Sequence, residues 1–373
     1  MCVSLVFYPA YSEMNKLSSF LFLIYFKFGR SARESRDLLF YCDFAQGNRS
    51  YSEKSCTFTP ETIRKRDMIN RILIRTKVVQ IVYSCLIDED KSLELAEKEL
   101  FASLEKSYEL YHLLLLIPVE LTRLQAQRLD AGRSKFLATE AEKYPNTRLV
   151  DNRFVALLEK NQAFRKYIKE RPLVWNDDTN YLRGLLDKIL DSEWYAEYLA
   201  ADDSFENDRT FWKNIYKQLI FPDENLGELL EAQSLYWNDD MPIISTFVLK
   251  TVKRFDEKSD ADHELLPMFK DEDDRDFART LFRRSMLNYE ENRSMIERFT
   301  RNWEIDRIAF MDIVVMVVAL AEITEFPSIP LQVSLNEYIE IAKSYSTPKS
   351  GNFINGVLDA VITLLKKEGK LTK

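Results

Sequence analysis

The chain carries a run of nine apolar residues without a charge, Ile313 to Ala321, and this run constrains the fold more than any other feature. A surface helix presents apolar side chains along one stripe only, whereas this run would cover a helix all round. We therefore predict that residues 307–323 form a central helix, buried nearly all round, against which other helices pack. Glycine and proline are scarce, at 8 and 11 of 373 residues, which favours helices elsewhere as well. The predicted fold class is all-α.

Prolines and a capping pattern follow this run. Pro327 and Pro330 cannot continue a helix, so they should end the central one. Ser334 precedes Glu337 by three residues, a spacing typical of a capping box, in which each side chain satisfies a backbone amide at a helix start. We predict that a helix begins at Ser334. Its apolar face would consist of Leu335, Ile339, Ala342 and Tyr345.

The last predicted helix has start and stop signals of its own. Thr347 is a suitable N-cap and Pro348 a suitable first helical residue. Gly369 is suited to the position just after a helix end. Between these signals, apolar side chains recur at helical spacing. They are Phe353, Val357, Val361 and Leu364, joined by Ile354, Leu358 and Leu365.

Three segments carry a resemblance to a known family. They are residues 333–343 (Val-Ser-Leu-Asn-Glu-Tyr-Ile-Glu-Ile-Ala-Lys), residues 350–359 (Ser-Gly-Asn-Phe-Ile-Asn-Gly-Val-Leu-Asp) and residues 302–312, running on to Ala321-Glu-Ile323. The first two, in their order and spacing, resemble the signature of the NusB transcription antitermination family, and the third resembles the long central helix that precedes them in that family. The resemblance is clear from about Asp271 to Leu371. It implies a NusB-like helical bundle, to which this chain adds a further helical extension.

The rest of the chain is predicted to contain a leader and that extension. Residues 1–67 show no sustained periodicity and lack a signal-peptide cleavage site, so we interpret them as a poorly structured leader, or as a misassigned start with translation from Met68. Residues 68–270 should hold the N-terminal helix (69–87) and the helical extension, in which Pro118 marks a kink or break of a long helical stretch. Residues 271–373 should form the NusB-like C-terminal core.

Basic residues gather in two stretches although the net charge is −8. Residues 64–77 hold six basic residues and one acid, and residues 342–373 hold six lysines and two acids. Local charge rather than the sum decides whether a surface attracts phosphate. We expect the two stretches to form one phosphate-attracting patch if the fold brings them together, as the resemblance implies.

The resemblance also implies a set of site residues. RNA would be held by the first helix and by the start of the last helix, and Glu322 matches a family position that faces a protein partner. From spacing alone, a plainer interpretation is favoured, in which Phe353 is core, Ser350 an ordinary polar residue and Lys349 solvated. The implied RNA-binding residues are Arg71, Arg75, Lys77, Lys349, Ser350, Asn352 and Phe353.

Recognition rather than catalysis is the function that the resemblance implies. The protein would bind single-stranded boxA-type RNA of nascent rRNA transcripts jointly with NusE, a small-subunit ribosomal protein, within the antitermination complex of RNA polymerase. The alternative is a helical protein–protein interaction scaffold that keeps the fold without binding RNA. The acidic net charge and the few arginines of the first helix favour this alternative.

Other chemistry finds little support in the sequence. The acidic run at residues 271–276 is interpreted as solvated acid at a helix start rather than a metal site, and His112 and His263 belong to no credible ligand set. Ser346-Thr-Pro-Lys349 matches a nucleophile motif only by chance, because its companion motifs are absent. Glycine-rich nucleotide loops are also absent. We expect no enzyme activity, no cofactor and no membrane partner, and the few cysteines fit a reducing cytoplasm.

Overall fold

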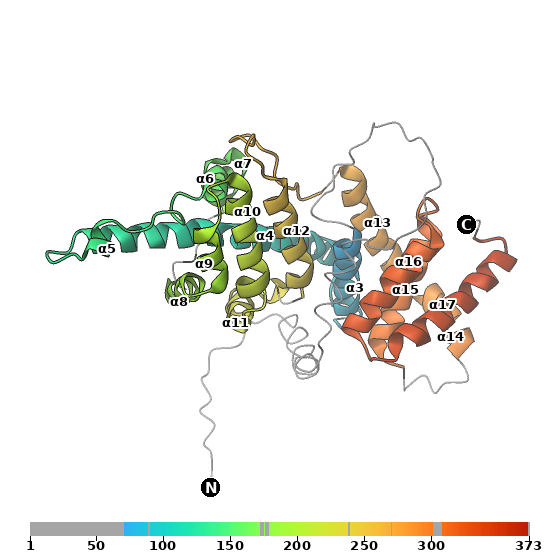
Figure 1. Ribbon diagram of the computed structural model, residues 1–373. Helices are drawn as coiled ribbons and strands as arrows, with labels where there is room; N and C mark the ends of the chain where they lie inside the picture. The colour runs from blue at the N-terminus through green and yellow to red at the C-terminus, as the bar shows by residue number, and fades with distance from the viewer. Residues whose placement is uncertain are drawn as a thin grey trace, which may run out of the picture. The chain divides into compact units, whose positions relative to one another are not determined.

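A computed structural model describes residues 71–88, 90–171, 175, 179–237, 239–269, 271–300 and 308–371 (Figure 1). All regular secondary structure in these ranges is helical, which confirms the predicted all-α class. The predicted leader, residues 1–67, lies outside the described ranges. The α-helices are α3 (Arg71–Ile87), α4 (Leu93–Arg133), α5 (Glu140–Lys143), α6 (Arg153–Lys160), α7 (Gln162–Glu170), α8 (Thr179–Leu190), α9 (Glu193–Ala200), α10 (Phe205–Ile215), α11 (Glu224–Gln233), α12 (Met241–Arg254), α13 (Glu272–Leu287), α14 (Tyr289–Thr300), α15 (Phe310–Glu325), α16 (Leu331–Tyr345) and α17 (Ser350–Lys367). A π-helical segment, η2 (Tyr216–Ile220), continues α10, and a 3₁₀ segment, η3 (Leu235–Trp237), precedes α12.

The chain divides into two compact units. The core unit contains the described residues from 79 to 96 and from 281 to 371, and the extension unit contains residues 71–78 and those from 97 to 280. The boundaries fall inside α3, α4 and α13, so each of these helices contributes residues to both units. The sequence-based organisation into residues 1–67, 68–270 and 271–373 stays a prediction.

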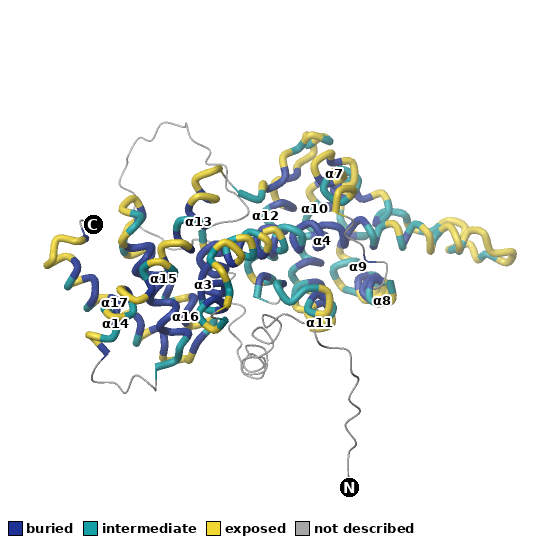
Figure 2. The backbone as a smooth tube through the Cα atoms, turned by 180° about the vertical axis from the view of Figure 1, so that it is seen from behind, coloured by how far each residue is buried: buried dark blue, intermediate teal, exposed yellow. Residues whose placement is uncertain are grey.

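Helix α15 is the centre of the core unit. Every residue from Met311 to Ile323 is buried, and Figure 2 shows this helix buried along most of its length. It packs against α14, α16 and α17. The prediction of a central helix that is buried all round is confirmed. A helix without a polar face is stable only when neighbours cover every side, and these three helices supply much of that cover.

Helix α16 begins earlier than predicted. Its N-cap is Pro330, whose extended backbone leads into a helix from Leu331, and no side chain caps the first turn. Ser334 therefore lies inside the helix, where it is fully buried and donates a hydrogen bond to Glu322. The predicted capping box at Ser334 is wrong, because that hydroxyl serves a tertiary contact instead of a backbone amide.

The last helix, α17, starts at Ser350 rather than directly after Thr347. The Thr347 carbonyl accepts the Ser350 N–H at 2.9 Å, so Thr347 begins the turn that leads into the helix. The predicted end is confirmed at Gly369, which has a φ of 67°. Its N–H bonds the Lys366 carbonyl, and the following N–H, of Lys370, bonds the Leu365 carbonyl. This pair of bonds is a Schellman motif, whose left-handed position glycine adopts without a steric penalty.

Helix α4 runs uninterrupted through Pro118, where the sequence indicated a kink or a break. A proline has no N–H, so it leaves the carbonyl four residues earlier, that of Leu114, without its helical donor. The Tyr216 hydroxyl donates to this carbonyl at 2.9 Å, and Trp175 Nε1 donates to the neighbouring Leu113 carbonyl at 3.2 Å. Side chains of the extension unit thus donate hydrogen bonds to helix carbonyls beside the proline, including the one that lacks its helical donor.

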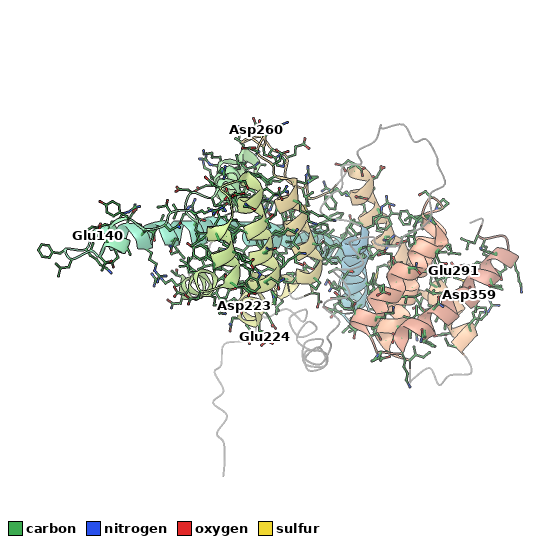
Figure 3. The ribbon with its side chains drawn as sticks, in the orientation of Figure 1. Glu140, Asp223, Glu224, Asp260, Glu291 and Asp359 are labelled. Carbon is green, nitrogen blue, oxygen red and sulfur yellow. The ribbon has the colours of Figure 1, made fainter. Side chains whose placement is uncertain are left out.

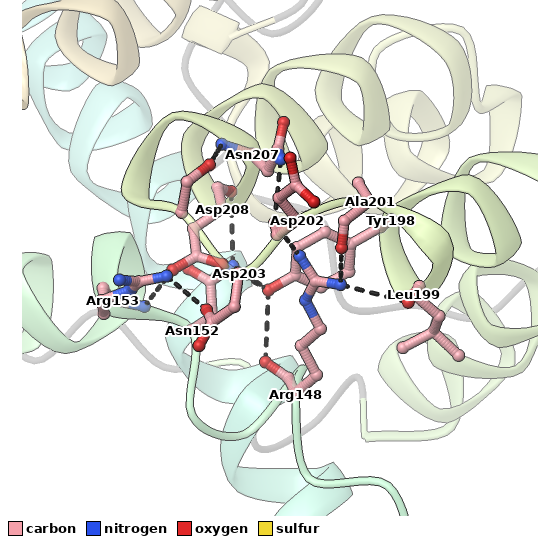
Figure 4. Close-up of polar contacts among 11 residues, drawn as sticks. Arg148, Asn152, Arg153, Tyr198, Leu199, Ala201, Asp202, Asp203, Asn207 and Asp208 are labelled. Carbon is pink, nitrogen blue, oxygen red and sulfur yellow. Dashed lines mark hydrogen bonds and ion pairs between the residues drawn. The ribbon is translucent and has the colours of Figure 1, made fainter.

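A buried carboxylate, Asp208, organises the polar interior of the extension unit (Figure 4). It is 2% exposed and accepts hydrogen bonds from the Tyr198 hydroxyl at 2.7 Å and from Arg153 Nε at 2.8 Å. Nearby, the Arg148 guanidinium donates to three carbonyls at the end of α9. They belong to Leu199, Ala201 and Asp202.

Candidate nucleic-acid interface

The start of α17 presents two polar side chains to solvent. Lys349 is the N-cap residue and is exposed, as is Asn352 in the first turn, whereas Phe353 is half-buried. The first amides of a helix have no intrahelical acceptor and point out of its N-terminus, where the helix dipole favours an anion. A lysine and an amide beside such amides can neutralise a phosphate and bond a sugar or base edge.

Gly351 brings a second lysine to this turn. A Cβ atom at Gly351 would lie 3.2 Å from Cγ and 3.3 Å from Cε of Lys343, so the stem of that lysine lies directly over the glycine backbone. Lys343 Nζ pairs with Glu340 at 2.6 Å on the exposed side of α16. The absence of a side chain at Gly351 therefore lets α16 place a cation close to the start of α17.

Ser350 holds this turn in place from the inside. It is 1% exposed, and its Oγ donates to Oδ2 of Asp312 at 2.9 Å, lies 3.1 Å from Ser346 Oγ and accepts the Thr347 N–H at 3.1 Å. Burial raises the pKa of Asp312, while hydrogen bonds from Ser346 and Ser350 oppose the rise. The role of Ser350 in RNA contact stays a prediction, and in the structure its hydroxyl is buried and bonded within the protein.

The basic residues of the first helix lie against acidic and aromatic groups of the extension unit. Arg71 Nε is 3.1 Å from Asp274 Oδ1, and the Arg71 guanidinium lies 4.8 Å from the centre of the Phe277 ring. Arg75 is 3% exposed and lies 5.6 Å from the centre of the same ring. Of the described cations of this helix, Arg71, whose side chain is 40% exposed, keeps a substantial solvent-facing surface. Arg64, Lys65 and Arg66, the other cations of this basic stretch, lie outside the described residues.

Lys77, like Ser350, is almost fully enclosed by protein. It is 1% exposed, its Nζ lies 2.8 Å from Asp240 Oδ1, and it donates to the Tyr236 carbonyl at 3.1 Å. Asp240 in turn accepts from Ser107 Oγ at 2.6 Å. An ammonium group in this position has almost no surface left for a phosphate. Sequence reasoning could not find the pairing, because its two members are far apart in the chain.

Glu322 is fully buried at the end of α15. Its carboxylate accepts hydrogen bonds from Ser334 Oγ at 2.7 Å and from the Tyr338 hydroxyl at 2.9 Å, which joins α15 to α16. The predicted role in partner binding would require this carboxylate to leave both hydroxyls. The sequence held a signal for its burial, because Glu322 directly follows the apolar run that makes α15 a core helix.

The second basic stretch does not gather at one point. Lys366 and Lys367 are exposed in the last turn of α17, roughly 25 Å along the helix from Lys349 at 1.5 Å per residue. The cations that lie near the helix start are Lys343 and Lys349. The candidate interface of the core unit is therefore the start of α17, formed by Lys343, Lys349, Asn352 and Phe353.

The fold and this surface define an all-helical protein with a candidate anion-binding helix start. Across the described ranges, no group of three or more histidine, cysteine or acidic side chains is placed to hold a metal ion. Within the same ranges, no helix has the length and apolar character needed to cross a membrane.

Comparison with known proteins places the chain in a family. The NusB family profile matches residues 246–363. The transcription antitermination protein NusB of Salinibacter ruber is 42% identical over 133 residues, which are 34% of this chain and 82% of that protein. The chain belongs to the NusB family, which confirms the resemblance found in the sequence.

Two other relatives are matched over shorter segments. The transcription antitermination protein NusB of Natranaerobius thermophilus is 40% identical over 91 residues, covering 24% of this chain and 66% of that protein. The protein of the same name from Chloroherpeton thalassium is 39% identical over 99 residues, covering 26% of this chain and 47% of that protein. No solved structure shows a significant match.

Proposed function

We propose that this protein is a transcription antitermination factor that binds single-stranded boxA-type RNA, together with NusE, through the start of α17. Family membership supports the general role, because the relatives are named transcription antitermination proteins. The observation that carries the RNA site is the exposure of Lys349 and Asn352 around helix-start amides, on a turn that the buried Ser350–Asp312 bond holds.

Each exposed group has a chemical task in this proposal. Lys349 and the first-turn amides other than that of Ser350, which already donates to the Thr347 carbonyl, bind one backbone phosphate, with Lys343 close by. The Asn352 side chain donates to and accepts from an unpaired base edge, and the half-buried ring of Phe353 offers its exposed part for stacking. Arg71 adds a backbone contact with its solvent-facing part. Ser350 and Asp312 position these groups without touching RNA.

The alternative function is a protein–protein interaction scaffold of the NusB fold that does not bind RNA. One observation favours it: the first-helix cations Arg71 and Lys77 are paired with Asp274 and Asp240 of the extension unit, and Arg75 is buried beside Phe277. Cations used in this way hold helices together instead of attracting phosphate. The first function predicts selective binding of RNA, whereas the scaffold predicts none.

Fluorescence anisotropy separates them. A boxA-like RNA and a scrambled control are titrated with the full chain, with and without NusE, across a series of salt concentrations. The proposal expects selective binding that tightens with NusE and falls about tenfold in Lys349→Gln and in Asn352→Ala. Lys366→Gln, at the far end of the same helix, serves as the matched charge control and should bind as the wild type does. Equally weak binding of both RNAs, insensitive to Lys349, would establish the scaffold.

A further inference from the structure

Three lysines of the extension unit lie on two helices that pack against each other. Lys213 and Lys217 follow Arg209 at intervals of four residues along α10 and its π-helical continuation, so they share one face of the helix. Lys253 lies in the last turn of α12, which packs beside α10 (Figure 1). Lys253 is exposed, and Lys213 and Lys217 are partly exposed.

Arg209 fixes the spacing of this cluster. Its guanidinium donates to the Lys253 and Phe255 carbonyls at 3.0 Å each, at the end of α12, and it also pairs with Glu206. The end of α12 is thereby attached to the face of α10 that carries Lys213. The nearness of the lysines is therefore built into the helix packing and does not depend on flexible side chains alone.

The cluster brings three lysines together without ion-pair partners in the described part of the chain. Lys213, Lys217 and Lys253 form no ion pair with any described residue. Burial, followed by the charges of Lys253, Lys217 and Arg209, lowers the pKa of Lys213, with only Glu206 opposing. Many other surface cations of the unit do pair with acids, whereas scattered ones such as Lys160 and Lys169 are also unpaired within the described ranges. The pairs include Arg123–Glu159, Arg128–Asp187, Arg133–Asp130, Lys135–Glu142, Lys143–Glu140, Arg153–Asp203 and Lys188–Asp223.

Three lysines held close together, with Glu206 bound to Arg209, favour an anion from outside the chain. In Figure 3, Asp260 lies at one end of the α10–α12 pair, and Asp223 and Glu224 lie at the other. The surface formed by Lys213, Lys217 and Lys253 attracts a ligand that carries several negative charges in a row, although the net charge of the protein is −8.

We propose that Lys213, Lys217 and Lys253 bind the sugar–phosphate backbone of single-stranded RNA outside the segment that the start of α17 recognises. The extension unit then supplies a second, sequence-independent contact to the same transcript. This inference rests on the proposed function for the source of the RNA, while the lysine contact itself can be tested separately.

RNA is favoured over an anionic lipid surface by the absence of an apolar anchor. A helix that lies on a membrane inserts large apolar side chains beside its basic ones. The exposed large apolar side chains of the described residues include none between residues 205 and 255. Binding through charge alone suits a flexible polyanion, because each neutralised phosphate releases counterions.

The test compares two triple variants of the full chain. Lys213→Gln/Lys217→Gln/Lys253→Gln removes the cluster, and Lys160→Gln/Lys166→Gln/Lys169→Gln removes the same charge from the exposed surface of α6 and α7. Three RNAs are used: the boxA-like RNA, the same RNA with a long single-stranded tail, and the tail alone. Circular dichroism verifies that both variants are folded.

The wild type and the control variant should bind the tailed RNA more tightly than the untailed boxA-like RNA. The cluster variant should lose this gain, so that its affinity for the tailed RNA falls by about tenfold or more at low salt. For the cluster variant, the slope of log affinity for the tailed RNA against log salt concentration should become less steep by about 2, because each of three lost phosphate contacts contributes roughly 0.7 in single strands. A tail without effect, or a cluster variant that binds the tailed RNA as the wild type does, overturns the inference. So does lysine-dependent binding to vesicles of anionic phospholipid without lysine-dependent binding to RNA.

Failure of the proposed function gives a different pattern. The boxA-like RNA alone would then not be bound, and the tail alone would decide the inference. Tail binding that the cluster variant loses and the control retains supports the lysine contact. Tail binding that is equal in all three proteins, or absent from the wild type, overturns it.

Discussion

Ser350 donates a 2.9 Å hydrogen bond to Oδ2 of Asp312, and this contact joins the first turn of α17 to the first turn of α15. Both residues are buried. The bond connects the candidate RNA surface to the most buried helix of the core unit. The geometry of Lys349 and Asn352 is thus set by a buried carboxylate, and the protonation state of that carboxylate becomes open to experiment.

Asp312→Asn should keep or raise stability at neutral pH. Burial raises the pKa of Asp312 above 3.8, so the folded protein holds this proton more tightly than the unfolded chain does. The stabilising effect of the protonated group is complete below the unfolded pKa and is lost as the pH rises through the folded pKa. The Asn amide is never charged and still offers an oxygen to Ser350.

Urea unfolding over a pH series measures this difference. The difference in the free energy of unfolding between Asp312→Asn and the wild type should be largest near neutral pH and should vanish as the pH falls toward 3.8. Asp359→Asn, on the exposed surface of α17 (Figure 3), is the control and should show no such trend. A variant that is markedly less stable than the wild type at neutral pH would mean that the charged form is needed.

Lys77→Met should destabilise the protein by about 3–5 kcal/mol, because it leaves Asp240 buried with its charge unpaired. Lys77→Met/Asp240→Asn should recover much of this loss, since the neutral amide still accepts from Ser107. Chemical denaturation of the two single variants and the double variant gives the coupling energy. Single variants with wild-type stability would indicate that the pair is open to water in solution.

Glu322→Ala should cost about 2–4 kcal/mol, because it removes the acceptor of two buried hydroxyls, those of Ser334 and Tyr338. Glu322→Gln keeps one acceptor oxygen and should cost less. NusE binding to Glu322→Gln, measured by calorimetry, then separates the two roles of this residue. Unchanged affinity marks Glu322 as a purely internal support, whereas lost affinity at wild-type stability would restore it as a partner contact.

Tyr216→Phe should cost about 1–2 kcal/mol, because the Leu114 carbonyl loses the donor that replaces its helical partner. In a Pro118→Ala background the same change should cost less, since the new N–H of residue 118 can bond that carbonyl. A double-mutant cycle followed by thermal unfolding gives the difference. Equal costs in both backgrounds would show that the hydroxyl acts elsewhere.

Features encoded by neighbouring residues were predictable from the sequence. The apolar run from Ile313 to Ala321 predicted a helix buried all round, and Gly369 predicted a helix end, because both depend on residues close in the chain. Ser334 was misread for a related reason: its hydroxyl suits a helix start, and nothing nearby reveals that Glu322 lies within 2.7 Å.

The candidate site was only partly predictable. Exposure of Lys349 and Asn352 follows from their place at the start of an amphipathic helix. The burial of Lys77 depends on Asp240, and the docking of Arg71 depends on Asp274, both of which lie far along the chain. A family motif gives the identity of a position, whereas its exposure depends on what the rest of this chain packs against it.

The Lys77 pair also has a consequence for synthesis on the ribosome. The carbonyl that Lys77 bonds belongs to a residue 159 positions further along the chain, and Asp240 comes later still. Lys77 therefore leaves the exit tunnel long before its partners exist, and it remains a hydrated cation while α4 to α11 are made. Closure of so long a loop comes late in folding and is slow. During that interval the nascent chain carries its basic first helix uncovered, within reach of any RNA nearby.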